Sequence, residues 1–313
     1  MPRRPLGASG IDVSVLGLGS WRTYERMSRE RSLAVMRAAR EHGITLLDDA
    51  RYNDETGTAP ISTGYSEVIF GELFRAAGWK RDEVIVTNKL WWEFWPEQSA
   101  ADELDASLGR MGFDYLDLVY SWSTDEGPPV EEIVDSVGAL IAAGRVRAWG
   151  TGNWEPEEHA SAARIAEQAG VPPPCAAQLP YSVAAREYVE SDAMVAALAS
   201  SGAAVVASYV LDGGALIGKY GDRSATGRLV GRLDEPRLHR VLGKAEALQG
   251  LAVELDTSAA ALAIAFALAN ERVATVLFGA TSPEQVAENV RAAQLLDRLT
   301  PDELDHLRAV GSK

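Results

Sequence analysis

Hydrophobic positions along the chain fall into two kinds of segment that alternate. Short runs rich in Val, Ile and Leu predict buried β-strands. Longer stretches between them repeat their apolar residues every three or four positions, which predicts amphipathic helices. The predicted strands lie at residues 13–18, 44–47, 83–87, 115–120, 146–150, 176–179, 203–207 and 273–277. The predicted helices lie at residues 31–42, 65–77, 99–111, 130–143, 156–168, 191–200, 258–269 and 283–293.

Strand-then-helix units repeat through the whole chain, and no polar, proline-rich linker separates them. This order predicts one closed parallel barrel, an α/β fold of the (β/α)8 or TIM type, with residues 1–313 as a single domain. An open doubly wound sheet is the main alternative. That fold normally carries a glycine-rich fingerprint after its first strand, and residues 17–21 (GLGSW) show only part of one. The barrel is therefore favoured.

Composition narrows the class of protein without naming a function. The 313 residues are 47% hydrophobic and carry a formal net charge of −15. This charge argues against a nucleic acid or an anionic membrane as the main partner. Cys175 is the only cysteine, so we expect no intrachain disulfide and no cysteine-rich metal site. The start MPRRPLGASG lacks an apolar signal segment, and residues 259–269 are too short to span a bilayer. A cytoplasmic protein is expected.

Polar side chains follow neighbouring strands of the predicted barrel. Asp48 and Tyr52 follow the second strand, and Lys89 follows the third. Active sites of such barrels lie at the C-terminal ends of the strands. A carboxylate favours the ammonium form of a nearby lysine, and an ammonium lowers the pKa of a nearby phenol, which can then protonate a developing alkoxide. A structural ion pair at the rim, with a tyrosine packed over it, is the other interpretation, and spacing does not decide between the two.

Tryptophan is concentrated after the predicted strands. Six of the eight tryptophans lie there, namely Trp21, Trp91, Trp92, Trp95, Trp122 and Trp154. Core filling is the usual role of an aromatic residue, but an indole carries an N–H group that needs a partner. Their position on the loop side predicts an aromatic-lined pocket that accepts apolar or planar substrates. The residues assigned to this substrate pocket are Trp21, Tyr52, Trp91, Trp92, Trp122 and Trp154.

These segments resemble the aldo-keto reductase family, whose fold is a (β/α)8 barrel. GITLLDDARY and VIVTNKL, which contain Asp48, Tyr52 and Lys89, are similar to the catalytic segments of the family. Similar segments follow in the family's order over nearly the whole chain: RPLGASGIDVSVLGLGSW for an N-terminal β-hairpin and first strand, then GRVRAWGTGNW, QLPYS, SYVLDGGALIGKY and LFGATSPEQVAENVRAAQ. The resemblance is closest to the branch that includes bacterial reductases and potassium-channel β-subunits.

The resemblance implies an NADP(H)-dependent oxidoreductase that reduces aldehydes or ketones. Tyr52 would donate the proton, Lys89 would lower the pKa of Tyr52, and Asp48 would hold Lys89. The family usually has its tyrosine five residues after the aspartate, whereas Tyr52 lies four after Asp48. Tyr65 is therefore a competing donor. We favour Tyr52, because Tyr65 lies at the start of a predicted helix.

One catalytic position departs from the family. The segment DLVYSW has Trp122 where the resemblance implies histidine. An indole N–H donates one hydrogen bond but cannot accept or shuttle a proton, and loss of a positioned donor lowers a rate by about 10²–10³. A non-catalytic or very slow nicotinamide-binding regulatory protein is thus a rival interpretation. A barrel lyase or hydrolase that uses Asp48 and Lys89 without nicotinamide is a second.

The resemblance also places a nicotinamide cofactor across the barrel mouth. The corresponding residues are Gly19, Ser20, Trp21, Asp48, Asn153, Gln178, Ser208, Tyr209, Leu211, Gly213, Gly218, Lys219, Gly279, Thr281, Gln285, Glu288 and Asn289. NADP(H) is favoured, with NAD(H) not excluded, although residues 279–289 contain no Lys or Arg. Lys219, Arg223, Arg228 and Arg232 are the alternative cations for a 2′-phosphate. The expected partner is a small carbonyl or alcohol, and the oligomeric state is not predicted.

Overall fold

Parallel strands close into a barrel at the centre of the molecule. The computed structural model describes residues 1–124, 126–220, 229 and 235–310. The barrel strands follow one another as β3 (Leu16–Gly19), β4 (Leu46–Asp48), β5 (Ile85–Leu90), β6 (Leu116–Trp122), β7 (Val146–Gly152), β8 (Ala176–Pro180), β9 (Ala204–Ser208) and β10 (Val273–Phe278). β10 pairs with β3 and completes the ring.

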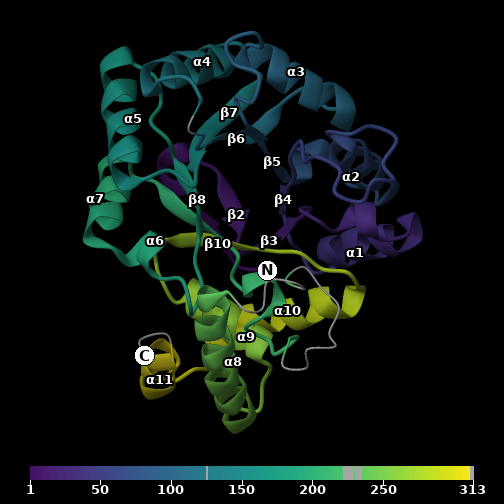
Figure 1. Ribbon diagram of the computed structural model, residues 1–313, viewed down its shortest axis with the longest axis vertical. Helices are drawn as coiled ribbons and strands as arrows, with labels where there is room; N and C mark the ends of the chain where they lie inside the picture. Colours follow the sequence, from purple (N-terminus) through teal and green to yellow (C-terminus); the bar gives the residue numbers. More distant parts are fainter. Residues whose placement is uncertain (125, 221–228, 230–234, 311–313) are drawn as a thin grey trace.

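Helices surround the barrel on its outside (Figure 1). One helix follows each strand: α1 (Arg29–Glu41), α2 (Tyr65–Ala76), α3 (Ala100–Met111), α4 (Val130–Ala142), α5 (Pro156–Ala169), α7 (Asp192–Ser201), α9 (Ala259–Leu268) and α10 (Pro283–Leu296). This order of elements confirms the predicted (β/α)8 barrel.

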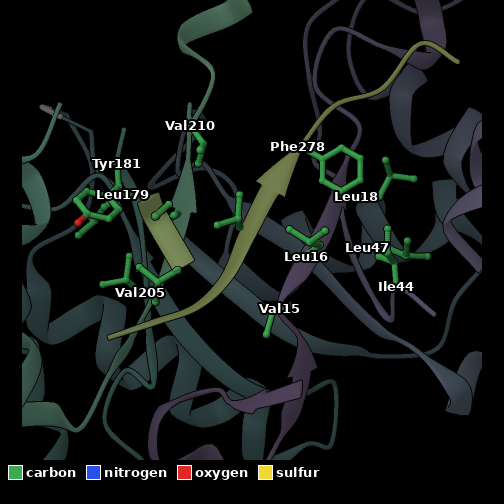
Figure 2. Packing of buried hydrophobic residues seen from close by; sticks show 14 of the residues in the cluster. Val15, Leu16, Leu18, Ile44, Leu47, Leu179, Tyr181, Val205, Val210 and Phe278 are labelled. Atoms are coloured by element: carbon green, nitrogen blue, oxygen red, sulfur yellow. The ribbon is translucent and has the colours of Figure 1, made fainter. Parts of the chain in front are cut away.

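Side chains alternate between the inside and the outside of the barrel, as expected for strands. Leu46 and Val206 belong to a cluster that fills the interior, whereas their neighbours Leu47 and Val205 pack in the outer layer beneath the helices. Figure 2 shows part of this outer layer. All four side chains are fully buried, and each such burial stabilises the fold by about 1.5–3 kcal/mol. Both layers together explain why the strands appear as continuous apolar runs.

A β-hairpin closes the N-terminal end of the barrel. β1 (Arg3–Pro5) pairs antiparallel with β2 (Asp12–Ser14), and Leu6, Ile11 and Val13 join the interior cluster. Arg4 donates a 2.6 Å hydrogen bond to the carbonyl of Val273, at the start of β10. The predicted hairpin is confirmed. The predicted strand at 13–18 was too long, because it joined the end of β2 to the barrel strand β3.

Other boundaries differ from the sequence-based prediction. The strand predicted at 83–87 is β5, which begins at Ile85 and ends at Leu90. It begins later than predicted because residues 81–83 form the 3-10 turn η3. Three helices were not predicted: α6 (Glu187–Glu190), α8 (Pro236–Glu254) and α11 (Pro301–Val310). Three further 3-10 turns are η1 (Gly7–Ser9), η2 (Tyr24–Arg26) and η4 (Asp212–Gly214). Within the described part of the chain, no single helix is long and hydrophobic enough to cross a membrane. Helices α8 and α9 meet these two criteria only when taken together, and the pair is bent by 99°.

Candidate active site

Strand register brings distant polar residues to one end of the barrel. Asp48 at the end of β4 pairs with Gly19 on one side and Thr87 on the other. The Asp48 carboxylate accepts a 2.7 Å hydrogen bond from the Thr87 hydroxyl and a 3.4 Å hydrogen bond from the side-chain amide of Gln178. Gln178 lies on β8, across the barrel from β4. Asp48 is therefore held in one orientation from two sides.

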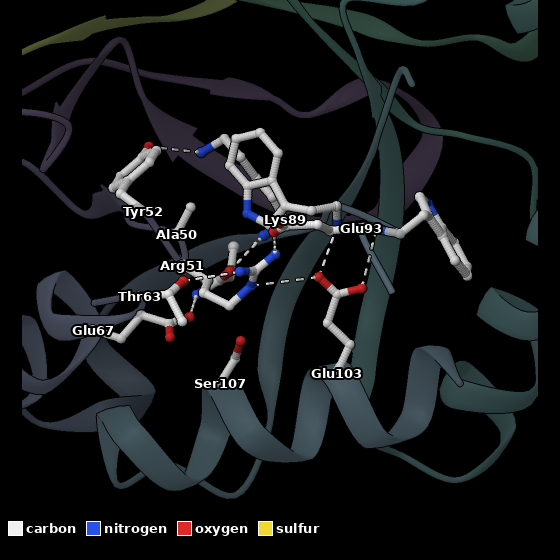
Figure 3. A network of polar contacts seen from close by, with 12 residues as sticks. Ala50, Arg51, Tyr52, Thr63, Glu67, Lys89, Glu93, Glu103 and Ser107 are labelled. Atoms are coloured by element: carbon white, nitrogen blue, oxygen red, sulfur yellow. Dashed lines mark hydrogen bonds and ion pairs between the residues drawn. The ribbon is translucent and has the colours of Figure 1, made fainter. Parts of the chain in front are cut away.

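The three residues of the predicted catalytic group lie in contact. Lys89 Nζ is 3.0 Å from Asp48 Oδ2 and 3.3 Å from the hydroxyl of Tyr52, and Figure 3 shows the contact between Lys89 and Tyr52. The Lys89 and Asp48 side chains are almost completely buried. Lys89 also donates to the backbone carbonyl of Asp49, at 3.4 Å. A phenol, an ammonium and a carboxylate thus form one hydrogen-bonded chain at the barrel mouth.

The pKa of Tyr52 differs from the sequence-based prediction. The predicted lowering by Lys89 was wrong for this structure, in which the pKa of Tyr52 is raised well above its ordinary value. The main cause is burial, which disfavours the charged phenolate, and the negative charges of Asp48 and Asp49 act in the same direction. Asp48, which lies 3.0 Å from Lys89, is the nearest of these charges to the ammonium and opposes its effect on the phenol. Tyr52 is consequently a neutral phenol at physiological pH, the form that can donate a proton.

Tyr65, the competing proton donor, lies elsewhere. It is the first residue of α2, and the guanidinium of Arg29 on α1 lies 5.9 Å from the centroid of its ring. None of the hydrogen bonds described for this structure joins Tyr65 to Lys89, whereas Tyr52 makes one. The geometry therefore brings Tyr52 rather than Tyr65 to the ammonium.

The loop at residues 53–64 is folded beside the mouth. Its Asp54 carboxylate accepts hydrogen bonds from backbone N–H groups of the same loop, and hydrogen bonding, chiefly from a threonine side chain, lowers the pKa of Asp54 to about 2. Glu55 forms ion pairs with Arg22 and Arg26, at 2.5 Å and 2.8 Å. These contacts hold the loop against the segment that follows β3.

Asp49 is a buried carboxyl group next to the catalytic residues that was not predicted as a site residue. It is completely buried, and its Oδ1 accepts a hydrogen bond from the hydroxyl of Ser20. Burial raises the pKa of Asp49 well above its usual range, and the charge of Glu67 adds to the effect. The Ser20–Asp49 contact joins the segment after β3 to the end of β4. One of the predicted cofactor residues is thereby fixed to the catalytic strand.

The ring of Trp122 lies beside the ammonium group of Lys89, at the position where the resemblance implied a histidine. Lys89 Nζ lies 5.7 Å from the centroid of the Trp122 ring, a favourable cation–π distance. The indole packs on Gly152 of the neighbouring strand β7, with which Trp122 is paired. A Cβ atom at position 152 would lie 2.7 Å from Trp122 Cζ3, which is too close for van der Waals contact. Gly152 therefore makes room for the indole.

A cavity of about 500 Å³ opens beside these residues. Its described lining consists of Trp91, Trp92, Glu93, Trp95, Trp122, Ser123, Thr124 and Glu126. The rings of Trp91 and Trp122 lie 5.2 Å apart, and Trp91 packs edge-on against Tyr52 at 6.1 Å. Two residues of the cavity lining thus also contact the predicted catalytic group, Trp91 at Tyr52 and Trp122 at Lys89.

Three predicted pocket residues, Trp154, Trp21 and Tyr52, do not line this cavity. Trp154 is buried in the outer hydrophobic core. Trp21 packs 5.4 Å from the ring of Tyr209, a residue that follows β9. The structure brings Trp91, Trp92 and Trp122 to the cavity, together with Trp95, and leaves Trp154, Trp21 and Tyr52 outside its described lining.

An ion-pair network beside the cavity, made of Arg51, Glu93 and Glu103, was missed by the sequence-based reasoning. Arg51 donates to Glu93 at 2.6 Å and lies 3.9 Å from Glu103 of α3. Glu103 in turn accepts hydrogen bonds from the backbone N–H groups of Trp91 and Trp92, at 2.9 Å and 3.2 Å (Figure 3). Burial raises the pKa of Glu103, although these bonds and Arg51 oppose the effect. The network connects the segment that carries Tyr52 to the segment of Trp91 and Trp92, which line the cavity.

The predicted nicotinamide end has features that fit an amide ligand. Gln178 Oε1 is buried and accepts no hydrogen bond from the described residues, so it can accept one from a carboxamide N–H. Asn153 is exposed, adopts a positive φ of 58°, and donates its backbone N–H to the Gln178 carbonyl. Tyr209 also has a positive φ of 55° and is 44% exposed. Strained backbone in non-glycine residues is concentrated at binding sites.

The remaining predicted cofactor residues follow the last two barrel strands. Ser208 ends β9, with Leu211, Gly213, Gly218 and Lys219 after it; Gly279, Thr281, Gln285, Glu288 and Asn289 follow β10. Gly218 adopts a positive φ of 78°, a conformation that favours glycine. Glu288 lines a second cavity of about 380 Å³ that also includes Arg291 and Arg298. Arg223, Arg228 and Arg232 lie outside the described residues.

Arg31, a cation that was not predicted as a site residue, contacts the segment assigned to the adenosine end. Arg31, in the first turn of α1, donates from Nε to the backbone carbonyl of Thr281. The side chain of Gln285 accepts from the backbone N–H of Thr281 at 2.8 Å. Sequence reasoning missed Arg31 because it lies 250 residues from Thr281. No local pattern could have found it.

The buried histidine that follows β7 is structural. His159 on α5 is buried between β7 and α7, hydrogen-bonded to Thr151 at 2.9 Å and Ser201 at 2.8 Å. Burial lowers the pKa of His159 to about 4. It therefore does not replace the missing active-site histidine. Among the described residues, no group of His, Cys, Asp and Glu side chains could hold a metal ion.

His159 should make the fold sensitive to mild acid. The unfolded chain binds a proton near pH 6.5, but the folded chain binds one only near pH 4. Stability is therefore full above pH 6.5 and falls as the pH drops toward 4, by about 2–3 kcal/mol for this group. Urea unfolding at pH 7 and pH 4.5 measures the fall. The difference between the two pH values should shrink by about 2 kcal/mol in His159→Asn, and an unchanged difference would contradict the assignment.

Comparison with known proteins adds an independent line of evidence. The model of the aldo/keto reductase family matches residues 15–312. A putative voltage-gated potassium channel subunit beta of Schizosaccharomyces pombe is 31% identical, over 96% of this chain and 91% of its own length. Probable voltage-gated potassium channel subunits beta of Oryza sativa subsp. japonica and Arabidopsis thaliana are 30% and 28% identical, each over 99% of this chain and 96% of the relative.

Proposed function

The chain belongs to the aldo/keto reductase family, and on that premise we propose that it is an NADP(H)-dependent reductase of small aldehydes or ketones. One observation carries the proposal. The Tyr52 hydroxyl lies 3.3 Å from Lys89 Nζ, which lies 3.0 Å from Asp48, at the end of the barrel where such folds place their chemistry.

Each of these residues has a distinct role in the proposed reaction. Tyr52 donates its proton to the carbonyl oxygen as negative charge develops there. Lys89 stabilises the phenolate that remains, and Asp48 fixes the position and charge of Lys89. Asn153 and Gln178 hold the cofactor carboxamide, which fits the unpaired Gln178 Oε1. When bound, the cofactor supplies the hydride that adds to the carbonyl carbon.

The decisive test is NADPH consumption with a panel of aromatic aldehydes, ketones and quinones. We expect turnover with at least some aromatic aldehydes, because the cavity beside Tyr52 is lined with indole rings. Dinucleotide binding is measured in parallel by quenching of tryptophan fluorescence. Binding without turnover on any carbonyl would reject the reductase, and failure of both dinucleotides to bind would reject a nicotinamide protein altogether.

A non-catalytic or very slow nicotinamide-binding regulator is the second candidate. Trp122 supports it, because an indole cannot replace the proton transfer of a histidine. The names of the relatives also support it, since all three are called potassium channel β-subunits. The intact Asp48–Lys89–Tyr52 chain favours the reductase instead, because a protein that only bound the cofactor would not need it.

We further propose that Arg31 contributes to a preference for NADPH over NADH. Its guanidinium lies at the backbone of Thr281, within the segment assigned to the adenosine end. Arg31→Ala should weaken NADPH binding about tenfold, as expected for loss of a charge-assisted contact, and leave NADH binding almost unchanged. Fluorescence titration with both dinucleotides measures the two affinities. Arg37→Ala, on the same helix, is the matched control, and equal losses for NADPH and NADH in Arg31→Ala would contradict the proposal.

A further inference from the structure

We propose that the cavity beside Tyr52 selects carbonyl substrates whose apolar or aromatic body carries a positive charge, such as a quaternary ammonium or protonated amine. The inference rests on the proposed reductase function and names the substrate class of the same site. It is carried by two features of the cavity wall, namely its tryptophan rings and its carboxylates.

Four tryptophan residues meet at one small volume. Trp91, Trp92, Trp95 and Trp122 all line the cavity of about 500 Å³. The rings of Trp91 and Trp122 are inclined at 46° with their centroids 5.2 Å apart, so these two indoles pack against each other at the cavity. Indole has the strongest cation–π attraction of the aromatic side chains, about 0.5–2 kcal/mol per contact. Several indoles around one volume are the arrangement that recognises ammonium groups.

The charged residues that line the cavity are negative, which favours a positively charged substrate. Glu93 and Glu126 line the cavity, and its described lining contains no lysine, arginine or histidine. None of the described residues forms an ion pair with Glu126, which is exposed at the opening. The chain as a whole has a formal net charge of −15, which is also negative. An anionic substrate would meet repulsion here, while a cation would be attracted.

Neighbouring cations do not cancel this preference. Lys89 is not part of the described lining and is paired with Asp48 at 3.0 Å. Arg51 lies behind the wall with its side chain only 7% exposed, and its one guanidinium faces the carboxylates of both Glu93 and Glu103. The wall therefore keeps an excess of negative charge.

Matched substrates test the inference directly. 4-(Trimethylammoniomethyl)benzaldehyde carries a cation, 4-neopentylbenzaldehyde is its neutral isostere, and 4-(sulfonatomethyl)benzaldehyde is an anion of similar size. The methylene group limits the effect of the charge on the reactivity of the carbonyl. We expect kcat/KM for the cation to exceed that for the neutral isostere at least about tenfold, and the anion to be the poorest substrate. The advantage of the cation should decrease as salt is added.

Variants identify the residues responsible. In Glu126→Gln and in Trp95→Leu, the ratio of kcat/KM for the cation to that for the neutral isostere should fall about three- to tenfold. Taking the ratio removes differences in carbonyl reactivity and in enzyme concentration. Glu41→Gln changes the net charge equally, at an exposed position in the last turn of α1, and should leave the ratio unchanged. An equal fall in Glu41→Gln would mean that only the overall charge matters, and would overturn the site.

The two proposals fail in distinguishable ways. Reduction of the neutral and cationic aldehydes with equal kcat/KM would overturn the cation preference and leave the reductase standing. If no aldehyde is reduced, the reductase fails, and calorimetric binding of benzyltrimethylammonium against its neutral analogue 2-methyl-1-phenylpropan-2-ol still tests the cavity. Tighter binding of the cation, weakened in Trp95→Leu, supports the inference; equal binding of the two overturns it.

Discussion

Tyr52→Phe should lower kcat for carbonyl reduction about 10²–10⁴-fold, the usual contribution of a positioned general acid. The substitution removes one hydroxyl, which lies 3.3 Å from Lys89 Nζ, and keeps the ring that packs against Trp91. The fold should therefore be unchanged. Steady-state NADPH oxidation measures kcat, and circular dichroism melting checks the fold.

Tyr65→Phe is the matched control, because Tyr65 packs under Arg29 at the start of α2. Its kcat should stay close to that of the parent chain. A large loss in Tyr65→Phe with a tolerated Tyr52→Phe would reverse the assignment of the proton donor.

The same assignment predicts how reduction depends on pH. The acid must be protonated to act, so the rate falls as the pH rises through its pKa. Because the pKa of Tyr52 is raised by burial and by Asp48 and Asp49, the phenol contributes no decline below about pH 10, the value for a free tyrosine. If the rate of the parent chain fell with a midpoint near pH 8, and this fall were absent from Tyr65→Phe, the proton donor would be Tyr65 and not Tyr52.

Gly152→Ala should destabilise the protein by about 1–3 kcal/mol, the usual range for overpacking, and should also alter its substrate preference. The added Cβ would lie 2.7 Å from Trp122 Cζ3, so the indole has to move. Because Trp122 forms part of the cavity wall and lies 5.7 Å from Lys89, its movement reshapes the site. Urea unfolding gives the change in stability, and kcat/KM over several aldehydes gives the change in preference.

A double-mutant cycle separates this clash from other effects of the substitution. In the background of Trp122→Leu, which removes the ring, Gly152→Ala should cost clearly less stability than in the parent chain. Gly109→Ala is the control, since no atom lies near its added Cβ, and a helical alanine there should stabilise by about 0.5–1 kcal/mol. Equal costs of Gly152→Ala in both backgrounds would show that Trp122 is not the obstacle.

The fold was largely predictable because its information is local. Barrel strands appear as short apolar runs and their helices as longer amphipathic ones, so the order of elements could be read directly. α8 escaped prediction because Gly243 and Gly250 interrupt its apolar pattern. The strand at 13–18 was drawn too long because β2 and β3 are separated only by Val15, and no turn residue marks the break.

The site was predictable only where residues follow strand ends. Asp48, Tyr52 and Lys89 could be grouped because strands of a parallel barrel end at one face. Arg31 at Thr281 depends on where α1 lies relative to β10, and the Arg51–Glu103 network depends on the packing of α3. Neither contact follows from a local sequence pattern. The pKa of Tyr52 was misjudged because its main determinant is burial, which the sequence does not show for a residue in a loop.

The Arg51–Glu103 network bears on any attempt to engineer the protein. Since Glu103 holds the main chain at positions 91 and 92, side chains there can be exchanged in a mutant library while the backbone keeps its path. Changes at 51 or 103 would disturb the tyrosine segment and the indole wall together. Random libraries that include those two codons should accumulate inactive members, whereas libraries confined to Trp95, Ser123 and Thr124 can diversify the opening without that burden.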